Sequence, residues 1–255
     1  MRIVVKVGTS TLAHKTGHLN IRRVETLCKM MSDLKNEGHE MILVSSGAIG
    51  MGIGKLSLKE RPSDVPTKQA AAAVGQCELM YTYDKLFLEY NHTVAQMLLT
   101  GSDFENPVRH RNFENTLFRL LELDAIPIIN ENDTVATEEI VIGDNDTLAA
   151  IVAVSAKADL LILLSDIEGL YTGDPHKDPD TMLISTVSEL NDTIMSSAGG
   201  HGSSLGTGGM TTKLHAAKIA TEAGIDMVIA NGSRRDVLYD IVDGKQIGTK
   251  FLKRK

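Results

Sequence analysis

The sequence predicts an α/β fold, specifically a three-layer αβα sandwich around a mainly parallel central sheet. Short β-branched runs alternate with longer stretches of helical periodicity along the chain, which is typical of this class. No linker-like composition interrupts the alternation, and a length of 255 residues suits one large domain. We therefore expect residues 1–255 to form a single domain, with helices on both faces of the sheet.

The first unit is a strand over residues 3–7, a helix over 20–38 and a strand over 41–44. Apolar residues within the helical stretch recur at spacings of three and four, Asn20 is a suitable N-cap, and Gly38 suits the helix end. The same pattern predicts further strands at 94–99, 126–129, 160–164 and 226–229, and helices at 68–90, 112–123, after 146 and at 212–223. We expect a hairpin at 135–142 and a solvated basic tail of Lys250, Lys253, Arg254 and Lys255.

Composition narrows the class of protein. Hydrophobic residues make up 42% and charged residues 23%, so the chain can bury a sizeable core. Cys28 and Cys77 lie in helical stretches without ligand-like spacing, which argues against a disulfide scaffold or structural zinc site. The formal net charge of -7 disfavours nucleic acid and anionic lipid as partners. The first apolar run ends at Lys6, too early for a secretory signal, and no run could span a membrane. We expect a cytoplasmic protein.

The first strand carries a lysine at an unusual position. Alternation places Lys6 on the face opposite Val5 and Val7, and a lysine in a buried strand is costly unless it meets an anion. Gly8 then allows a tight turn, although the segment lacks the spacing of a Walker A loop. Lys6 is thus interpreted as a phosphate contact, the alternative being an edge-strand lysine that reaches solvent.

Small or polar residues follow three other strands. Ser46 and glycine-rich residues follow the second strand, as a ligand loop or merely a close-packed turn. Acid-amide clusters stand at 130–133 and 144–146, the second of which could equally be ordinary helix caps. Since ligands bind at the carboxyl ends of strands in open α/β sheets, we expect these clusters to position a ligand or a lysine.

A glycine-rich loop precedes the helix predicted at 212–223. Consecutive backbone N–H groups before a helix suit phosphate oxygens. Lys213 stands in the first turn of that helix, where the helix dipole disfavours a cation unless an anion offsets it. The loop and Lys213 are therefore predicted to be a phosphate site.

Six segments together resemble the amino acid kinase family, and within it the branch that phosphorylates glutamate. They are residues 5–10 (VKVGTS), 46–49 (SGAI), 129–133 (INEND), 143–146 (GDND), 166–171 (DIEGLY) and 206–213 (GTGGMTTK). The resemblance implies transfer of the ATP γ-phosphate to the side-chain carboxylate of L-glutamate, the first step of proline biosynthesis, with Mg²⁺.

The resemblance also implies roles for individual residues. Lys6 and Lys213 would neutralise the transferring phosphoryl group, and Asp146 would hold both lysines. Ser46, Asp133 and Asn145 would bind glutamate, with Asp133 as partner of its ammonium group. The ATP-binding residues would be Lys6, Ser165, Asp166, Thr207, Gly208, Gly209, Met210, Thr211, Thr212 and Lys213.

Further expectations follow from the resemblance. We expect a homo-oligomer (dimer or tetramer), proline as a feedback inhibitor, and a glutamyl phosphate reductase as partner. The C-terminal RNA-modification-type (PUA) domain that many such kinases carry is not expected, since the kinase unit ends near Lys255. The alternatives are a sister kinase acting on N-acetylglutamate, aspartate, UMP or carbamate, or a non-catalytic nucleotide-binding protein of the same fold. A nucleic-acid-binding module ranks below both.

Overall fold

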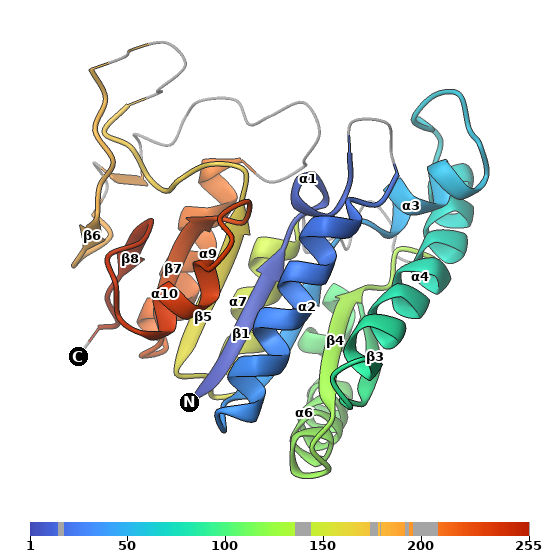
Figure 1. Ribbon diagram of the computed structural model, residues 1–255, viewed down its shortest axis with the longest axis horizontal. Coiled ribbons are helices and arrows are strands. Elements are labelled where there is room, and N and C mark those ends of the chain that lie inside the picture. The colour runs from blue at the N-terminus through green and yellow to red at the C-terminus, as the bar shows by residue number, and fades with distance from the viewer. Residues whose placement is uncertain are drawn as a thin grey trace.

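The computed structural model describes residues 1–14, 18–135, 144–173, 178, 180–191, 194–195 and 209–254. These residues form one eight-stranded sheet of order β3-β4-β2-β1-β5-β7-β8-β6, in which β7 and β8 are the only antiparallel neighbours among the described pairs. The strands are β1 (Arg2–Val7), β2 (Glu40–Ser45), β3 (Val94–Leu99), β4 (Ile126–Glu131), β5 (Leu160–Ser165), β6 (Thr186–Val187), β7 (Asp226–Asn231) and β8 (Thr249–Phe251). This arrangement confirms the predicted mainly parallel sheet (Figure 1).

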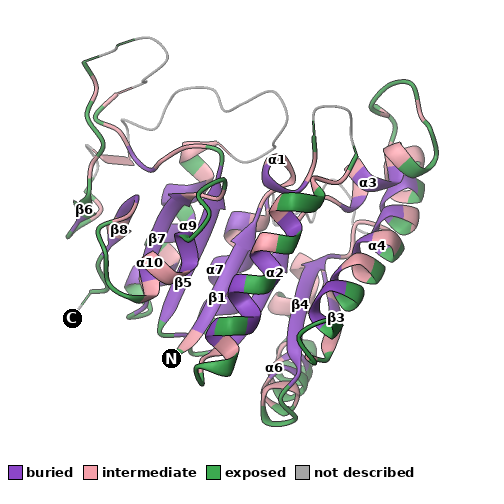
Figure 2. Cartoon of the chain, in the orientation of Figure 1, coloured by how far each residue is buried: buried purple, intermediate pink, exposed green. Residues whose placement is uncertain are grey.

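Helices cover both faces of the sheet. They are α1 (Thr9–Leu12), α2 (Ile21–Asn36), α3 (Ala48–Lys55), α4 (Val65–Leu88), α5 (Gly101–Glu105), α6 (Pro107–Glu122), α7 (Asn145–Ser155), α9 (Met210–Glu222) and α10 (Val237–Val242). Alternation along β1 divides the core: Val4 packs with residues of α6, α7 and α9, whereas Val5 and Val7 pack with residues of α2, α4 and α10. Figure 2 shows the central strands β1, β4, β5 and β7 largely buried and the outer helix faces exposed, as a three-layer sandwich requires.

Long periodic elements match their predicted positions. The Asn20 side chain caps α2 by accepting from the backbone N–H of Arg23, and Gly38 has a φ of +93°, which favours glycine. Met30, Met31 and Met97 are buried in the core. Cys28 and Cys77 are free cysteines within α2 and α4.

Short elements were missed. Helices α1, α3, α5 and α10 have eight residues or fewer, too few to show a clear period, and α3 contains three glycines. The prediction of a solvated basic tail is wrong in part. Thr249–Phe251 form β8, and Lys250 pairs with Asp226 at 3.0 Å. Apart from Val135, the hairpin expected at 135–142 lies outside the described residues.

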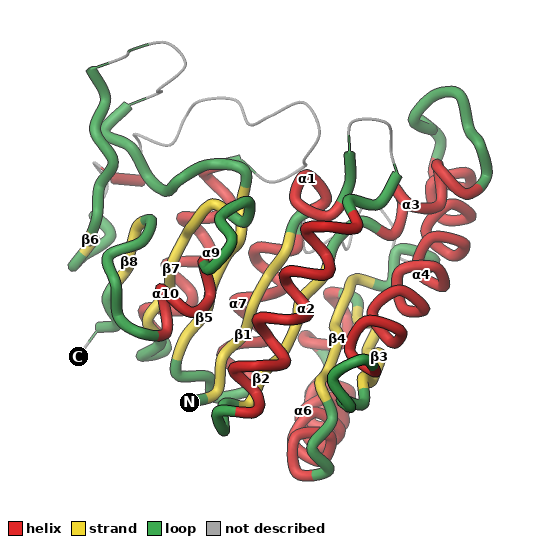
Figure 3. Tube along the Cα trace, viewed as in Figure 1, coloured by secondary structure: helices red, strands yellow, loops and turns green. Residues whose placement is uncertain are grey.

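The carboxyl ends of the parallel strands face one edge of the sheet, where loops and helix starts gather (Figure 3). No helix of the described chain is both long enough and apolar enough to cross a membrane.

Helices α3 and α4 meet through glycine. A Cβ atom on Gly75 of α4 would lie 1.8 Å from the carbonyl oxygen of Ala48, and one on Gly52 of α3 would lie 1.8 Å from that of Ala71. Only glycine allows this approach of backbone to backbone. The contact holds α3, and with it the loop after β2, against α4.

We predict that Gly75→Ala lowers the free energy of unfolding by at least ~2 kcal/mol, because the methyl group overpacks a backbone contact. Gly50→Ala in α3 is the matched control. Its Cβ would meet Thr9 Cγ2 at 3.4 Å, and alanine favours helix. Urea unfolding measures both variants. Equal stabilities would contradict the close helix contact.

Candidate active site

Polar residues converge where β1, β2, β4 and β5 end. Lys6 is the penultimate residue of β1, which is flanked by β2 and β5 and is therefore a central strand. The alternative of an edge-strand lysine reaching solvent is thus wrong, since Lys6 is only 8% exposed. Its ammonium group needs a charged partner inside the protein.

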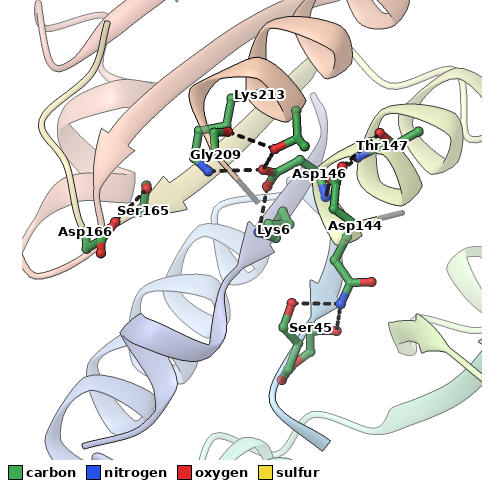
Figure 4. Close-up of polar contacts among 12 residues, drawn as sticks. Lys6, Ser45, Asp144, Asp146, Thr147, Ser165, Asp166, Gly209 and Lys213 are labelled. Carbon is green, nitrogen blue, oxygen red and sulfur yellow. Dashed lines mark hydrogen bonds and ion pairs between the residues drawn. The ribbon is translucent and has the colours of Figure 1, made fainter. Parts of the chain in front are cut away.

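That partner is Asp146, which stands between two lysines (Figure 4). Lys6 Nζ lies 2.6 Å from Asp146 Oδ1, and Lys213 Nζ donates a hydrogen bond of 3.1 Å to Oδ2. The Thr212 hydroxyl also donates to Oδ2, at 3.0 Å. Asp146 is 1% exposed and Lys213 6% exposed, so the structure brings all three predicted charged residues together in the interior.

Two helix starts hold this cluster. Asp144 caps α7 by accepting from the backbone N–H groups of Asp146 and Thr147, which places Asp146 in the first turn. Helix α9 begins after Gly209, and Lys213 follows in its first turns. A cation at the start of a helix needs an anion nearby, and in this structure Asp146 is that anion for Lys213.

The two carboxyl groups at the start of α7, those of the cap Asp144 and of Asp146, have opposite pKa shifts. Burial raises the pKa of Asp146, but the charges of Lys6 and Lys213 outweigh burial and hold it below its usual value. Burial raises the pKa of Asp144, opposed by its backbone hydrogen bonds and by Lys6. Asp146 is thus the anion of the cluster, facing two cations.

A second group of polar side chains lies beside the cluster. The two N–H groups of Asn145 Nδ2 are shared among three acceptors: Ser46 Oγ at 2.7 Å, the Ser45 carbonyl at 3.0 Å and Asn130 Oδ1 at 3.1 Å. The structure therefore brings together Asn145 and Ser46, two of the three residues predicted to bind the acceptor substrate. It adds Asn130, a residue of the INEND motif to which no separate role was given.

Asp133, the third of these residues, follows β4 and is partly buried. Desolvation raises its pKa to about 6. No ion pair to it occurs among the residues that the structure describes. A cationic ligand would stabilise the ionised form of such a partly buried carboxylate.

The predicted nucleotide residues lie at two neighbouring places. Ser165 ends β5, and its hydroxyl donates to Asp166 Oδ1 at 3.2 Å (Figure 4). Gly209 caps α9, which Met210 and Thr211 begin. Thr207 and Gly208 lie outside the described residues.

The described residues offer no group of three or more His, Cys, Asp or Glu side chains that could hold a metal ion. Both oxygens of Asp146 already face ammonium groups. A Mg²⁺ ion held by carboxylate oxygens of the protein alone therefore does not fit the described part of this site.

We predict that Asp146→Asn lowers the free energy of unfolding by about 3 kcal/mol at pH 7, because two buried ammonium groups lose their anion. The pKa of Asp146 is depressed in the folded protein, so its contribution is present above pH ~4 and lost as the pH falls through the folded pKa. The difference in free energy of unfolding between wild type and variant should therefore decrease as the pH is lowered. Urea titrations from pH 7 to pH 3 measure it.

Asp124→Asn is the control, since Asp124 pairs with Lys35 and its own side chain is 86% exposed. An exposed pair contributes about 1 kcal/mol or less. Equal losses in the two variants would mean that the buried cluster contributes no special stability.

Comparisons with known proteins identify the family of this chain. The model of the amino acid kinase family matches residues 1–231. A glutamate 5-kinase of Clostridium tetani is 56% identical over 249 residues, covering 98% of this chain and 93% of that protein. One from Caldanaerobacter subterraneus is 54% identical, covering 100% of this chain and 68% of that protein.

Solved structures show the same fold at low identity. An isopentenyl phosphate kinase of T. acidophilum has a TM-score of 0.67 at 16% identity, covering 98% of this chain and 100% of that one. A UMP kinase of Ureaplasma parvum has a TM-score of 0.67 at 14% identity, covering 99% and 98%. With the family model spanning most of the sequence and relatives above 50% identity over nearly all of it, this chain belongs to the amino acid kinase family, in its glutamate 5-kinase group.

Proposed function

We propose that this protein transfers the γ-phosphoryl group of ATP to the side-chain carboxylate of L-glutamate, giving γ-glutamyl phosphate and ADP. This is the activity after which its close relatives are named. The observation that carries the proposal is the buried Lys6–Asp146–Lys213 cluster at the carboxyl ends of the strands.

The charge of this cluster suits phosphoryl transfer. One carboxylate faces two ammonium groups, which leaves positive charge for the transferring group. Phosphoryl transfer is catalysed mainly by positioning and by stabilisation of charge on the phosphoryl oxygens. Lys6 and Lys213 supply that stabilisation, and Asp146 positions them.

The acceptor needs no general base. The glutamate side chain is already ionised at pH 7. One of its oxygens attacks the γ-phosphorus, the bond from that phosphorus to the β–γ bridging oxygen breaks, and ADP leaves with the electron pair. A catalytic histidine or carboxylate near the acceptor is therefore unnecessary.

The acceptor subsite consists of Ser46, Asp133 and Asn145. Asp133 pairs with the α-ammonium group of glutamate, which favours free glutamate over N-acetylglutamate, whose nitrogen bears no charge. Its raised pKa supports this role, because a cation would relieve the cost of the buried carboxylate.

The nucleotide subsite consists of Ser165, Asp166 and residues 207–213. Backbone N–H groups at a helix N-terminus suit phosphate oxygens. Mg²⁺ enters as part of the MgATP substrate and neutralises phosphate charge there.

The remaining expectations from the sequence stay predictions. They are a single domain over residues 1–255, a cytoplasmic location, a dimeric or tetrameric assembly, inhibition by proline, and a reductase that takes over the acyl phosphate.

The direct test is ADP release from MgATP by the purified protein, with hydroxylamine present to trap an acyl phosphate. L-Glutamate is compared with N-acetylglutamate, aspartate and UMP. We expect turnover and hydroxamate with L-glutamate. Turnover with another acceptor alone would transfer the proposal to a sister reaction, and ATP binding without turnover would favour a non-catalytic protein.

We predict that Lys6→Ala lowers kcat by ~10²–10³, the usual loss for one electrostatic donor at a transition state. Lys245→Ala is the control, because Lys245 forms an exposed pair with Asp240 at 2.7 Å. Steady-state ADP release measures both variants. Activity of Lys6→Ala within tenfold of wild type would reject the role.

We predict that Asp133→Asn raises the glutamate KM at least ~10-fold, as expected on losing a charge-assisted hydrogen bond, with little change in the ATP KM. The same variant should be more stable than wild type above pH 6. The raised pKa means that the native protein loses stability as the pH rises from about 4 through about 6, where Asp133 ionises, and asparagine removes that loss. Equal changes in both KM values would refute the assignment.

Thermal unfolding at pH 5 and pH 8 checks the stability arm of this prediction. The difference in Tm between Asp133→Asn and wild type should be larger at pH 8. If the Tm difference between the variant and wild type instead falls from pH 5 to pH 8, a partner stabilises the Asp133 carboxylate in the free protein.

A further inference from the structure

Three side-chain amides connect helix α4 to the acceptor subsite. Asn130 Nδ2 donates to Gln76 Oε1 at 2.9 Å, and Asn145 Nδ2 donates to Asn130 Oδ1 at 3.1 Å. The series ends at Ser46, whose Oγ accepts from Asn145. Gln76 is 7% exposed and Asn130 1% exposed, so the connection runs through the protein interior. We call Gln76, Asn130 and Asn145 the amide relay.

Backbone groups fix the direction of this relay. The N–H of Glu131 donates to Asn130 Oδ1 at 2.9 Å, and a backbone N–H can only donate. The carbonyl of Ser45 accepts from Asn145 Nδ2, and a carbonyl can only accept. With its oxygen so engaged, Asn130 must turn its Nδ2 toward α4, where Gln76 Oε1 accepts.

While Gln76 makes this contact, its own amide donor has no partner among the described residues. Its Oε1 faces Asn130, and its Nε2 is buried with no hydrogen-bond partner among the described residues. A buried unpaired donor costs about 1–3 kcal/mol. An apolar side chain of similar size would avoid this cost but could not accept from Asn130. The glutamine is therefore explained by what its oxygen does.

The relay determines what Ser46 can offer a ligand. A hydroxyl group has one proton and two acceptor lone pairs. Because Asn145 donates to Ser46 Oγ, the hydroxyl proton of Ser46 is left to point at another acceptor. Next to a subsite for an anion, that acceptor is a carboxylate oxygen.

We propose that Gln76 is a positioning residue for the acceptor substrate, which acts through Asn130 and Asn145 to hold the Ser46 hydroxyl as a donor to a carboxylate group of the amino acid. This inference rests on the proposed function, since it concerns the same acceptor subsite. It assigns a role to a side chain of α4 that lies outside every motif of the site.

The relay and the charged cluster are separable. Asn145 turns toward β2 and β4, where it contacts the Ser45 carbonyl and Asn130 Oδ1. Its neighbour Asp146 turns toward Lys6 and Lys213 (Figure 4). A change at Gln76 should therefore affect the acceptor and spare the nucleotide.

The test is Gln76→Met, which keeps the size of the side chain and removes its acceptor. We expect the glutamate KM to rise about tenfold, the equivalent of one hydrogen bond to a charged group, with the ATP KM and kcat within about threefold of wild type. Gln76→Leu serves as the second variant should methionine fail to fold. Unchanged glutamate KM in a folded variant would overturn the proposal.

A double-mutant cycle with Ser46→Ala separates positioning from general structural damage. Gln76 and Ser46 are linked only through the relay in this proposal, so Gln76→Met should change the glutamate KM less than about twofold once Ser46 is alanine. Additive effects would mean that Gln76 acts by another route and would overturn the proposal.

Tyr83→Phe is the matched control on the same helix. Tyr83 Oη bonds Ser45 Oγ at 2.9 Å, so this variant also removes a buried hydrogen bond between α4 and the end of β2. We expect lower stability but an unchanged glutamate KM. An equal rise in KM for Tyr83→Phe would refute a role specific to the relay.

The same experiment distinguishes the two levels of inference. Wild-type protein without glutamate-dependent turnover would remove the proposed function and this inference with it. Normal wild-type turnover with no KM effect at Gln76 would remove this inference alone.

Discussion

The ion pairs of Asp146 are the constraint around which the site is built. A buried carboxylate with one lysine would be a costly neutral pair, and the desolvation of such groups often exceeds their attraction. Here a second lysine from another element shares the same carboxylate, and the pKa of Asp146 is depressed despite its burial. The register of α7 against β1 and α9 therefore has to be right for the protein to tolerate these charges at all.

Helix α7 joins the two halves of the site through consecutive residues. Asn145 and Asp146 are adjacent, and successive side chains of a helix point about 100° apart. One therefore reaches the end of β2 and the other reaches β1 and α9. The Asp144 cap fixes the start of the helix, so it sets the orientation of both side chains together. Acceptor and phosphoryl donor would thus be aligned by a single helical turn.

The sequence predicted the long elements and the charged residues because both leave local signals. Periodicity located α2 and most other long helices, and the misplacement of Lys6 on a strand and Lys213 at a helix start marked them as paired with an anion. Short elements such as α1 and β8 have too few residues for a period, and the tertiary pairing of β7 with β8 decides the latter. Gln76 could not be found, since a glutamine within an alanine-rich helix is an ordinary residue until the fold brings Asn130 beside it.

The topology also sets the order in which the site can be completed during synthesis. Strand β1 is the first strand to be made, yet its neighbour β5 is separated from it by more than half of the chain. Until α7 and β5 have emerged from the ribosome, Lys6 lacks its counterion Asp146 and one edge of β1 remains unpaired. Non-local pairing of this kind slows folding and exposes unpaired strand edges. A nascent chain that stops before β5 therefore leaves this edge of β1 open to pairing with another chain.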